Sequence, residues 1–472
     1  MINKVLELFE NNQICFYIKS SKVIKNDLRF DPTHYIDDST ITLNTEIRFK
    51  KLKNFIFSIN EPNLFTRYYC AKEYGLPYIS SSEMSEIEPP VNSRFISKEL
   101  TNNISQYVLK RGQILVSAAG TVGSIVIATK ELDGVAGTSD ILRINVDMQN
   151  NLGFIYTYLT SSYGANELSN LAYGAIIKRV RGKQLEELKT PQIDDNSILK
   201  MNELILSALN KRDIANELIQ KSRHLVLQYN KLSPLKEAIL ENIDTANEAD
   251  IRLVNITEFT SDYRIDAHFY NPLAFSAVKN IITNSADYRT LKNGIAKRDF
   301  YLNRFTRTFV GKGFGIPYLA GKDIIKIRPN DVSYLSKSET SGLDAYKMKK
   351  GWILMTCSGT LGRTCYIWNN YEDWVGTHDL IRIETEDSFD SGYLSAFLTT
   401  EYGYYQALKF KHGSVIDHLT PEQVEQIIVP IPKKSEIKEI GDLVRKAFDL
   451  RAEAIKLEDE AQEILTNALT GK

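Results

Sequence analysis

The chain has 472 residues, 43% hydrophobic and 25% charged, which is typical of a soluble globular protein of about three domains. Its formal net charge of −1 excludes a uniformly basic protein that coats nucleic acid, but not local basic patches. The four cysteines lack CxxC spacing, no N-terminal segment resembles a signal peptide, and no apolar run approaches the roughly 20 residues that span a bilayer. We therefore expect a cytoplasmic protein without a metal site or disulfide framework.

The N-terminal part of the chain introduces a pattern that occurs again in the second half. Residues 4–10 favour a short helix, and an Arg-x-Asp-x-x-x-Tyr motif follows at 29–35. The same motif stands at 264–270, 235 positions later. It could form a surface contact, but we expect a buried structural ion pair capped by the tyrosine.

A second repeated pattern surrounds a stretch that differs between the copies. Phe-Thr-Arg occurs at 65–67 and 305–307, and seven residues separate each from Gly-x-Pro-Tyr at 75–78 or 315–318. A constant frame around a variable insert is typical of a recognition loop, because loops carry binding while the scaffold is retained. Divergence of an unimportant surface loop is an equally open alternative.

The strongest repeat covers residues 107–144 and 346–383. Thirteen of its 38 positions are identical without a gap, whereas chance would give roughly two or three, so the chain contains an internal duplication. Each copy has a Gly-Thr-x-Gly turn between two apolar runs and then a Gly-Thr-x-Asp turn before another apolar run, which predicts strands joined by glycine turns. A phosphate cradle is the alternative, but neither copy has the Lys-Ser/Thr that it requires.

Each copy continues through a short helix, predicted at 153–164 and 392–403, to a closing proline, Pro191 or Pro430. Between them, residues 174–181 align with residues 413–419. Aligned positions here carry different hydrogen-bonding groups, which suits two modules that read different partners. These pairs are Lys178 and Asp417, Arg179 and His418, and, in the preceding turn, Ser139 and His378.

Beyond each proline the pattern becomes that of a long helix. Steps of three and four residues connect Ile198 to Tyr229 and Ile437 to Ala468, with Arg212 and Arg451 at the same step of the two series. Ten consecutive such positions predict a coiled-coil seam, with a lone amphipathic helix on its own domain as the alternative. We expect Pro234 to end or kink the first helix, before an acidic connection at 242–250.

A basic and aromatic run, residues 296–313, surrounds the Phe-Thr-Arg motif of the second module. It carries five cationic residues against one acidic residue, interleaved with Phe and Tyr, which suits contacts with a phosphate backbone and with bases. A solvated edge strand is the alternative. The Phe-x-Gly-x-Gly at 309–313 is formally that of an adenosylmethionine site, but no Asn-Pro-Pro-Tyr-like tetrapeptide accompanies it, so we treat it as a coincidence.

The duplicated order of these motifs, with a long helix after each module, resembles the specificity (S) subunit of type I restriction-modification systems over nearly the full chain. The resemblance implies an α+β fold in which two similar target-recognition domains are separated by two long helices that form an antiparallel coiled coil. It implies domains at 1–194 and 248–432, a central helical spacer at 195–247 and a C-terminal one at 433–472. Each recognition domain would read half of a bipartite, asymmetric DNA target.

The same resemblance implies partners and cofactors. These are double-stranded DNA, two methyltransferase subunits and restriction subunits; S-adenosylmethionine, ATP and Mg would be bound by the partners and not by this chain. No Walker loop, His-Glu-x-x-His or nucleophile constellation occurs, so we expect no catalysis. A duplicated coiled-coil adaptor that binds only proteins is the alternative function. As DNA-binding candidates we assign Arg67, Lys72, Ser139, Lys178, Arg179, Arg181, Arg298, Arg304, Arg307, Lys312, His378, His412 and His418.

Overall fold

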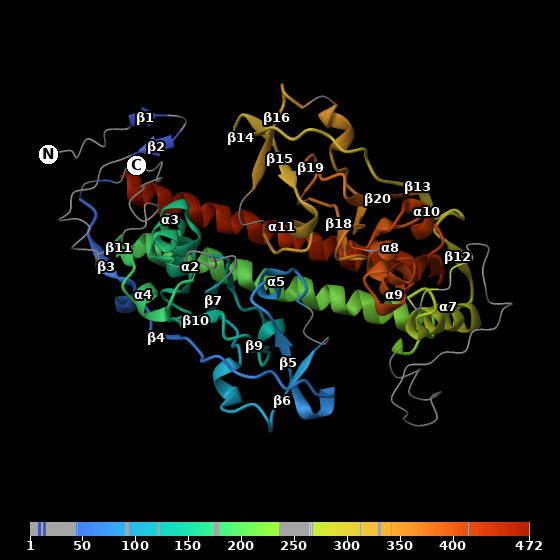
Figure 1. The fold of residues 1–472 in the computed structure, drawn as a ribbon, viewed down its shortest axis with the longest axis horizontal. Helices are drawn as coiled ribbons and strands as arrows, with labels where there is room; N and C mark the ends of the chain where they lie inside the picture. The colour runs from blue at the N-terminus through green and yellow to red at the C-terminus, as the bar shows by residue number, and fades with distance from the viewer. Residues whose placement is uncertain are drawn as a thin grey trace. The chain divides into compact units, whose positions relative to one another are not determined.

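The computed structural model forms two compact units, which are described separately (Figure 1). Unit 1 comprises Met1–Met84, Pro90–Leu206 and Glu458–Lys472, and unit 2 comprises Ser85–Pro89 and Ser207–Leu457. The structure describes residues 44, 46–89, 94–119, 123–173, 179–235, 264, 266, 268–311, 313–328, 332–340, 342–369, 371–413 and 415–471, and the backbone of 8–10 and 13–15.

The main sheet of unit 1 contains the duplicated core. Its strand order is β4 (Ser58–Asn60), β10 (Ile141–Asn145), β7 (Ile114–Ser117) and β8 (Ile125–Ile127), and all neighbours are antiparallel. Every residue of β7 and β8 is buried, as expected for uninterrupted Ile, Leu and Val runs. The predicted strands on either side of the Gly-Thr-x-Gly turn are therefore confirmed.

A second sheet of unit 1 brings the two repeated turn motifs together. Strand β5 (Gly75–Ile79) pairs antiparallel with β6 (Phe95–Ser97) and parallel with β9 (Ala136–Gly137). Tyr78 lies opposite Ala136 in this register. The Gly-x-Pro-Tyr strand consequently runs beside the Gly-Thr-x-Asp turn, although more than 50 residues separate them in the sequence.

Two helices stand where we predicted one. Helix α2 (Leu152–Thr160) ends at Ser161, whose side chain accepts a hydrogen bond from the Gly164 amide and begins α3 (Ser162–Leu171). A Cβ on Gly164 would lie 2.0 Å from the Tyr158 carbonyl oxygen, so a residue without a side chain is needed at this corner. The unit closes with α4 (Gly182–Glu186) and with β11 (Lys189–Pro191), which pairs with β3 (Phe49–Lys51).

Unit 2 repeats this arrangement. Its main sheet has the order β13 (Ala296–Phe300), β20 (Leu380–Thr385), β17 (Ile353–Thr356), β18 (Thr364–Tyr366), and its second sheet the order β14 (Phe309–Val310), β16 (Ser333–Ser336), β15 (Gly315–Leu319), β19 (Val375–Gly376). The remaining elements are α7 (Pro272–Asn284), β12 (Tyr288–Thr290), α8 (Ser391–Leu398), α9 (Glu401–Lys409), α10 (Pro421–Val424) and β21 (Ile428–Pro430).

Short 3-10 turns connect these elements: η2 (Leu52–Asn54), η3 (Lys72–Tyr74), η4 (Glu83–Ser85), η5 (Ile104–Tyr107), η6 (Lys130–Leu132), η8 (Gly321–Asp323) and η9 (Leu343–Tyr346). The prediction of a helix over residues 4–10 is wrong for Leu8–Glu10. These residues form β1, which pairs with β2 (Gln13–Cys15). The pairing of β1 with β2 overrides the local helical preference of the segment.

The Arg-x-Asp-x-x-x-Tyr motif forms the predicted ion pair in unit 2, but the pair is not fully buried, because the Asp266 side chain is 42% exposed. The Nε of Arg264 lies 2.8 Å from Asp266 Oδ2, and the Tyr270 hydroxyl donates to the Arg264 carbonyl. Arg264 also donates to the carbonyl of Phe410, 3.0 Å away, just beyond the C-terminus of α9. A cation at this end of a helix satisfies its last carbonyls. The copy at 29–35 lies outside the described residues.

The two long helices are α5 (Asp195–Tyr229) and α11 (Lys434–Thr470). In unit 2, the Tyr229 hydroxyl donates a hydrogen bond to Glu439, and Lys211 donates one to Glu453. A later residue of α5 therefore contacts an earlier residue of α11. The helices are therefore antiparallel there. Their predicted seam positions are mostly buried: Met201, Ile205, Ala208, Ala215, Ile219, Ser222 and Val226 on α5, and Ile440, Val444, Ala447, Ala454, Ala461 and Leu465 on α11.

The long helices combine the two predicted alternatives, a coiled-coil seam and an amphipathic helix packed on its own domain. In unit 2 the seam residues Val226 and Val444 belong to the same buried cluster as Tyr393 and Phe397 of α8. The helices thus pair with each other and also complete the core of the domain. Helix α5 ends at Tyr229, ahead of Pro234, through the left-handed residue Lys231 (φ 53°).

Candidate functional site

Each unit presents an arginine over a tyrosine ring at the edge of its second sheet. The Arg67 guanidinium lies 6.0 Å from the ring centre of Tyr78, and the Arg307 guanidinium lies 5.9 Å from that of Tyr318. Arg307 also donates from Nη1 to the Tyr318 hydroxyl at 3.0 Å. Both arginines are exposed. The repeat in sequence is therefore also a repeat of side-chain geometry, which we call the Arg–Tyr pair.

The segment before each arginine is fixed on the scaffold by a phenylalanine. Phe65 packs against Tyr107 and Phe305 against Tyr346, with ring centres 4.1 Å apart in both units. The hydroxyls of these tyrosines donate to the carbonyls of residues 63 and 303, at 3.0 and 3.2 Å. Both tyrosines open the duplicated core, so the strongest repeat in the sequence supports the loop that carries the Arg–Tyr pair.

A buried arginine holds the Gly-Thr-x-Asp turn of unit 1. Arg143 on β10 is 0% exposed, and its guanidinium donates to the carbonyls of Gly137 (2.9 Å) and Tyr107 (3.0 Å). Burial lowers the pKa of Arg143 to about 10, so the side chain stays charged at neutral pH. A buried cation persists only when acceptors replace its hydration, and carbonyl oxygens serve here.

Arg382 does the same in unit 2. It is 0% exposed and donates to the carbonyls of Leu380, Gly376 and Thr377 at 2.9, 3.1 and 3.0 Å, and burial lowers its pKa to about 10. In the sequence, both arginines stand at the end of an apolar run, which predicts only that they lie in strands. Their identity in both copies, in otherwise apolar strands, was the signal that could have revealed their positioning role.

The turn that Arg143 holds leads to the polar candidates of unit 1. Ser139 is buried, whereas Asp140 is partly exposed and lies 3.8 Å from Arg179. Arg181 donates from Nε to the Tyr173 hydroxyl at 2.8 Å. Ser139, Arg179 and Arg181 therefore lie close to one another, and that they form a binding surface stays a prediction. Lys178 lies outside the described residues.

Histidines occupy the equivalent edge of unit 2. The backbones of His412 and His418 bond each other, as those of Tyr173 and Arg179 do in unit 1. His378 takes the place of Ser139, and its Nε2 lies 3.3 Å from Asp379. Burial lowers the pKa of His378; Asp379 opposes this effect, while Arg307 and Arg304 add to it. His378 is consequently neutral at pH 7 and can both donate and accept.

The other candidates differ in how far they are already paired. Arg298 contacts Glu384 in an ion pair and covers the ring of Phe300 at 4.6 Å, so a phosphate would have to compete with a carboxylate for it. Arg304 and Lys72 are exposed, and Lys72 lies in η3. Lys312 lies outside the described residues. That the thirteen candidates contact DNA remains a prediction.

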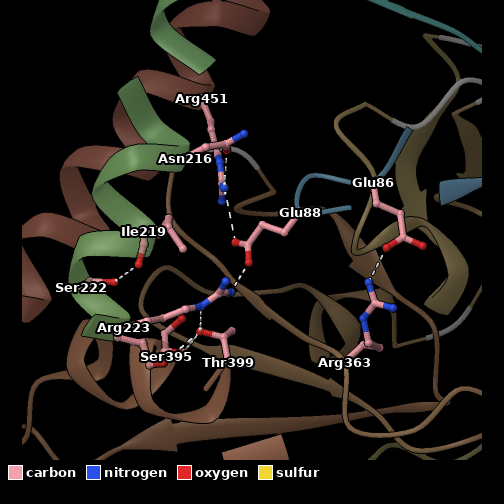
Figure 2. Close-up of polar contacts among 11 residues, drawn as sticks. Glu86, Glu88, Asn216, Ile219, Ser222, Arg223, Arg363, Ser395, Thr399 and Arg451 are labelled. Atoms are coloured by element: carbon pink, nitrogen blue, oxygen red, sulfur yellow. Dashed lines mark hydrogen bonds and ion pairs between the residues drawn. The ribbon is translucent and has the colours of Figure 1, made fainter. Parts of the chain in front are cut away.

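The Ser85–Pro89 strap, which belongs to unit 2, explains the arginine in the seam. Glu88 contacts Arg223 and Arg451 of the two long helices, and Arg451 also donates to Asn216 at 3.0 Å (Figure 2). Burial raises the pKa of Glu88, but the two arginines lower it by more, so the net pKa lies below its usual range. Arg451 is thus a paired residue and not a defect of the seam.

The strap also contacts residues of unit 2 outside the long helices. Glu86 pairs with Arg363 (Figure 2), and the Ile327 amide donates to the Ser85 carbonyl at 2.8 Å. Sequence reasoning missed the strap, because nothing in residues 85–89 indicates which helix they contact. Its only local signal is an acidic residue on either side of Ile87.

A comparison with protein families bears on the two functions left open by the sequence, a DNA specificity subunit and an adaptor that binds only proteins. The family model described as type I restriction modification DNA specificity domain matches residues 44–226 and 313–461, together more than half of the chain. The chain belongs to this family. The family predicted from the duplicated motifs is confirmed, as is the α+β fold with two specificity domains and long helices. Membership in this family favours DNA specificity over a protein-only adaptor.

Solved structures give weaker likenesses. The chain is 16% identical to the S subunit of a type I restriction-modification system from M. genitalium, covering 91% of this chain and 97% of that one, with a TM-score of 0.33. It is 14% identical to the HsdS subunit from Thermoanaerobacter tengcongensis, covering 92% and 100%, with a TM-score of 0.28. No curated protein matches the chain.

Two further properties of the specificity-domain chain concern its described residues. No group of three or more His, Cys, Asp and Glu side chains is arranged there to hold a metal ion. No helix among them is long and apolar enough to cross a membrane.

Proposed function

We propose that the chain is the DNA specificity subunit of a type I restriction-modification complex and that each unit reads one half of a bipartite, asymmetric target. One observation carries the asymmetry. The two units keep the Arg–Tyr pair but replace Ser139 and Arg179 with His378 and His418 at one edge. Equal scaffolds with different donors and acceptors would present different hydrogen-bonding patterns to the major groove.

The shared Arg67 and Arg307 then have a different role from the residues that differ. A group common to both units cannot by itself distinguish two half-sites, so the arginines would contact phosphate or a base that both half-sites contain. The residues that differ would determine the rest of the sequence. His378, neutral and little exposed, would read a base edge and not a phosphate.

Partner subunits would supply the chemistry. We infer two adenine methyltransferase subunits, which bind S-adenosylmethionine, and restriction subunits, which use ATP and Mg, all acting in the cytoplasm on DNA that this chain selects. No cofactor would bind to this chain. The support is the absence from the sequence of a Walker loop, a methyltransferase tetrapeptide and a nucleophile constellation.

Two measurements on the purified chain test this function. Its affinity for genomic DNA fragments should fall with rising salt, with a slope that reports the phosphates neutralised. The chain alone should transfer no methyl group, and adding the methyltransferase should produce methylation at one bipartite sequence, mapped by methylation-sensitive sequencing. Methyl transfer by the chain alone would overturn the non-catalytic role. If the chain binds the methyltransferase but shows no DNA binding at any salt concentration, the protein-only adaptor is supported instead.

A further inference from the structure

Each unit exposes an aromatic ring directly before its Gly-x-Pro-Tyr strand. Tyr74 is 72% exposed and Phe314 is 79% exposed, although large apolar side chains are usually covered. The insert between Arg67 and Gly75 differs from its counterpart at most positions, but this position is aromatic in both. The interpretation of the insert as variable therefore needs correction: its chemistry is retained at this ring.

The backbone fixes each ring in the same place. The Tyr74 amide donates to the carbonyl of Ala71 and the Phe314 amide to that of Gly311, both at 3.1 Å, so each ring ends an equivalent four-residue turn. We call the two rings with these amide–carbonyl hydrogen bonds the aromatic turns; Lys312, between Gly311 and Phe314, lies outside the described residues. The glycine that follows anchors each turn, because a Cβ on Gly315 would lie 2.5 Å from the Leu335 carbonyl oxygen of the neighbouring strand.

The same close approach occurs in unit 1. A Cβ on Gly75 would lie 2.8 Å from the Cβ of Phe95 and 2.7 Å from the Sγ of Cys70. The strand after each aromatic turn is thus packed against its neighbour with no space for a side chain. The glycine after each ring is therefore closely packed in its sheet, and the exposed ring stands directly before it.

The residues on either side of each ring in the sequence include further exposed aromatic and cationic groups, which suit a nucleic acid. In unit 2, exposed Phe309 lies 5.8 Å from the Tyr318 ring, and the Arg307 guanidinium covers the same ring. In unit 1, exposed Tyr69 lies 6.3 Å from Tyr78. Guanidinium groups pair with phosphates and aromatic faces stack on bases, so the charge and the apolar surface of this edge are both complementary to DNA.

We propose that Tyr74 and Phe314 are wedges, each of which inserts between stacked base pairs in the half-site that its own unit contacts. The proposal rests on the proposed function. A ring face stacks on every base, so a wedge carries little sequence information and can be the same in two units that read different sequences. Methylation of a base in a duplex requires that base to leave the stack, and an inserted ring offsets part of the lost stacking.

The test uses the full chain with its methyltransferase partner and the target duplex found by methylation mapping. 2-Aminopurine, whose fluorescence rises when it is unstacked, replaces bases one at a time through both half-sites. With the unaltered chain we expect a rise at one step in each half-site. Phe314→Ala should abolish the rise in one half-site only, and Tyr74→Ala the rise in the other.

Matched variants separate a wedge from a general surface effect. Phe314→Tyr keeps a ring and should restore the fluorescence rise. Tyr288→Ala removes a ring that is 41% exposed on β12, outside the aromatic turn, and should leave it unchanged. Loss of one base–aromatic stack should weaken target binding by about 5- to 150-fold for Phe314→Ala.

The outcomes also separate this inference from the proposed function. If the unaltered chain binds and directs methylation but Phe314→Ala and Tyr74→Ala leave both fluorescence and affinity unchanged, the wedge is wrong and the DNA specificity function stands. If Phe314→Ala instead prevents association with the methyltransferase while DNA binding is intact, the ring contacts protein and the wedge is again wrong. If the unaltered chain shows no salt-dependent DNA binding, the proposed function itself fails.

Discussion

Replacing Glu88 with glutamine tests whether the strap neutralises the arginines of the helical seam. The substitution keeps the size and an acceptor oxygen but removes the charge that Arg223 and Arg451 share. Side-chain exposure is 26% for Glu88, 19% for Arg223 and 9% for Arg451, so water replaces little of the lost interaction. Two guanidinium groups would then stay largely buried without their carboxylate.

The expected loss of stability follows from this burial. Breaking a fully buried ion pair costs roughly 3–5 kcal/mol, and the partial exposure of Glu88 places Glu88→Gln lower, at about 2–3 kcal/mol. For a unit of this size that corresponds to a fall of about 5–10 °C in the midpoint of its thermal unfolding. Calorimetry of the full chain measures both quantities. Asp344→Asn, which removes the exposed ion pair with Lys347, is the control and should leave the midpoint unchanged.

The effect should also depend on pH in one direction. The folded-state pKa of Glu88 is lowered, so its stabilisation is fully present above its unfolded-state pKa and is lost as the pH falls through the folded value. The difference between Glu88→Gln and the unaltered chain should be constant from pH 7 to about pH 5 and shrink below about pH 4. An unchanged midpoint at pH 7, or a difference that grows in acid, would refute the neutralising role.

Three further predictions concern the recognition edges and the helices. Arg382→Lys supplies fewer donors to the turn carbonyls, so it should destabilise unit 2 by about 2–4 kcal/mol and weaken recognition of one half-site. An equal loss of sequence specificity at both half-sites in methylation mapping would contradict this. Arg307→Ala should relax one base position by about 1–3 kcal/mol if the arginine contacts a base; uniform weakening with a salt slope smaller by about one would show a phosphate contact instead. Inserting four residues beside Lys211 and four beside Glu453, which face each other across the antiparallel helices, should widen the gap in the target by about two base pairs, since each insertion adds about 6 Å. An unchanged gap would show that the helices do not set it, and two-residue insertions, which rotate the seam by about 200°, should prevent assembly.

The pattern of apolar residues and glycines along the sequence was sufficient to predict many of the strands and helices. The apolar runs that became β7 and β8 are separated by a glycine turn in both copies, and such a turn selects an antiparallel pair. The three- and four-residue steps through Met201 and Ile205 place one face of a helix inward wherever it packs. Both features depend on residues close in sequence, so duplication of the pattern was enough to predict duplication of the domain.

Local pattern failed where two preferences competed at short range. Residues 4–10 have helical periodicity, yet Leu8–Glu10 pair with the strand that follows. One helix was predicted at 153–164, but Ser161 ends it and begins another through its own side chain. A serine side chain can accept a hydrogen bond from an amide at the start of a helix, and a serine can also lie within a helix. Here the close packing of Gly164 against the Tyr158 carbonyl accompanies the first arrangement.

The sequence by itself determined that the chain carries two copies of one module, each followed by a long helix, because repeats and periodicity are readable without knowing any contact. Only the tertiary structure decided what the charged and aromatic residues do. In the structure, Arg143 and Arg382 donate hydrogen bonds to the carbonyls of the Gly-Thr-x-Asp turns. Glu88 pairs with the seam residue Arg451, and the Phe314 ring is exposed. The reason is that charge and burial depend on neighbours brought together by strand pairing, as when Tyr318 meets Val375 across two strands far apart in the chain.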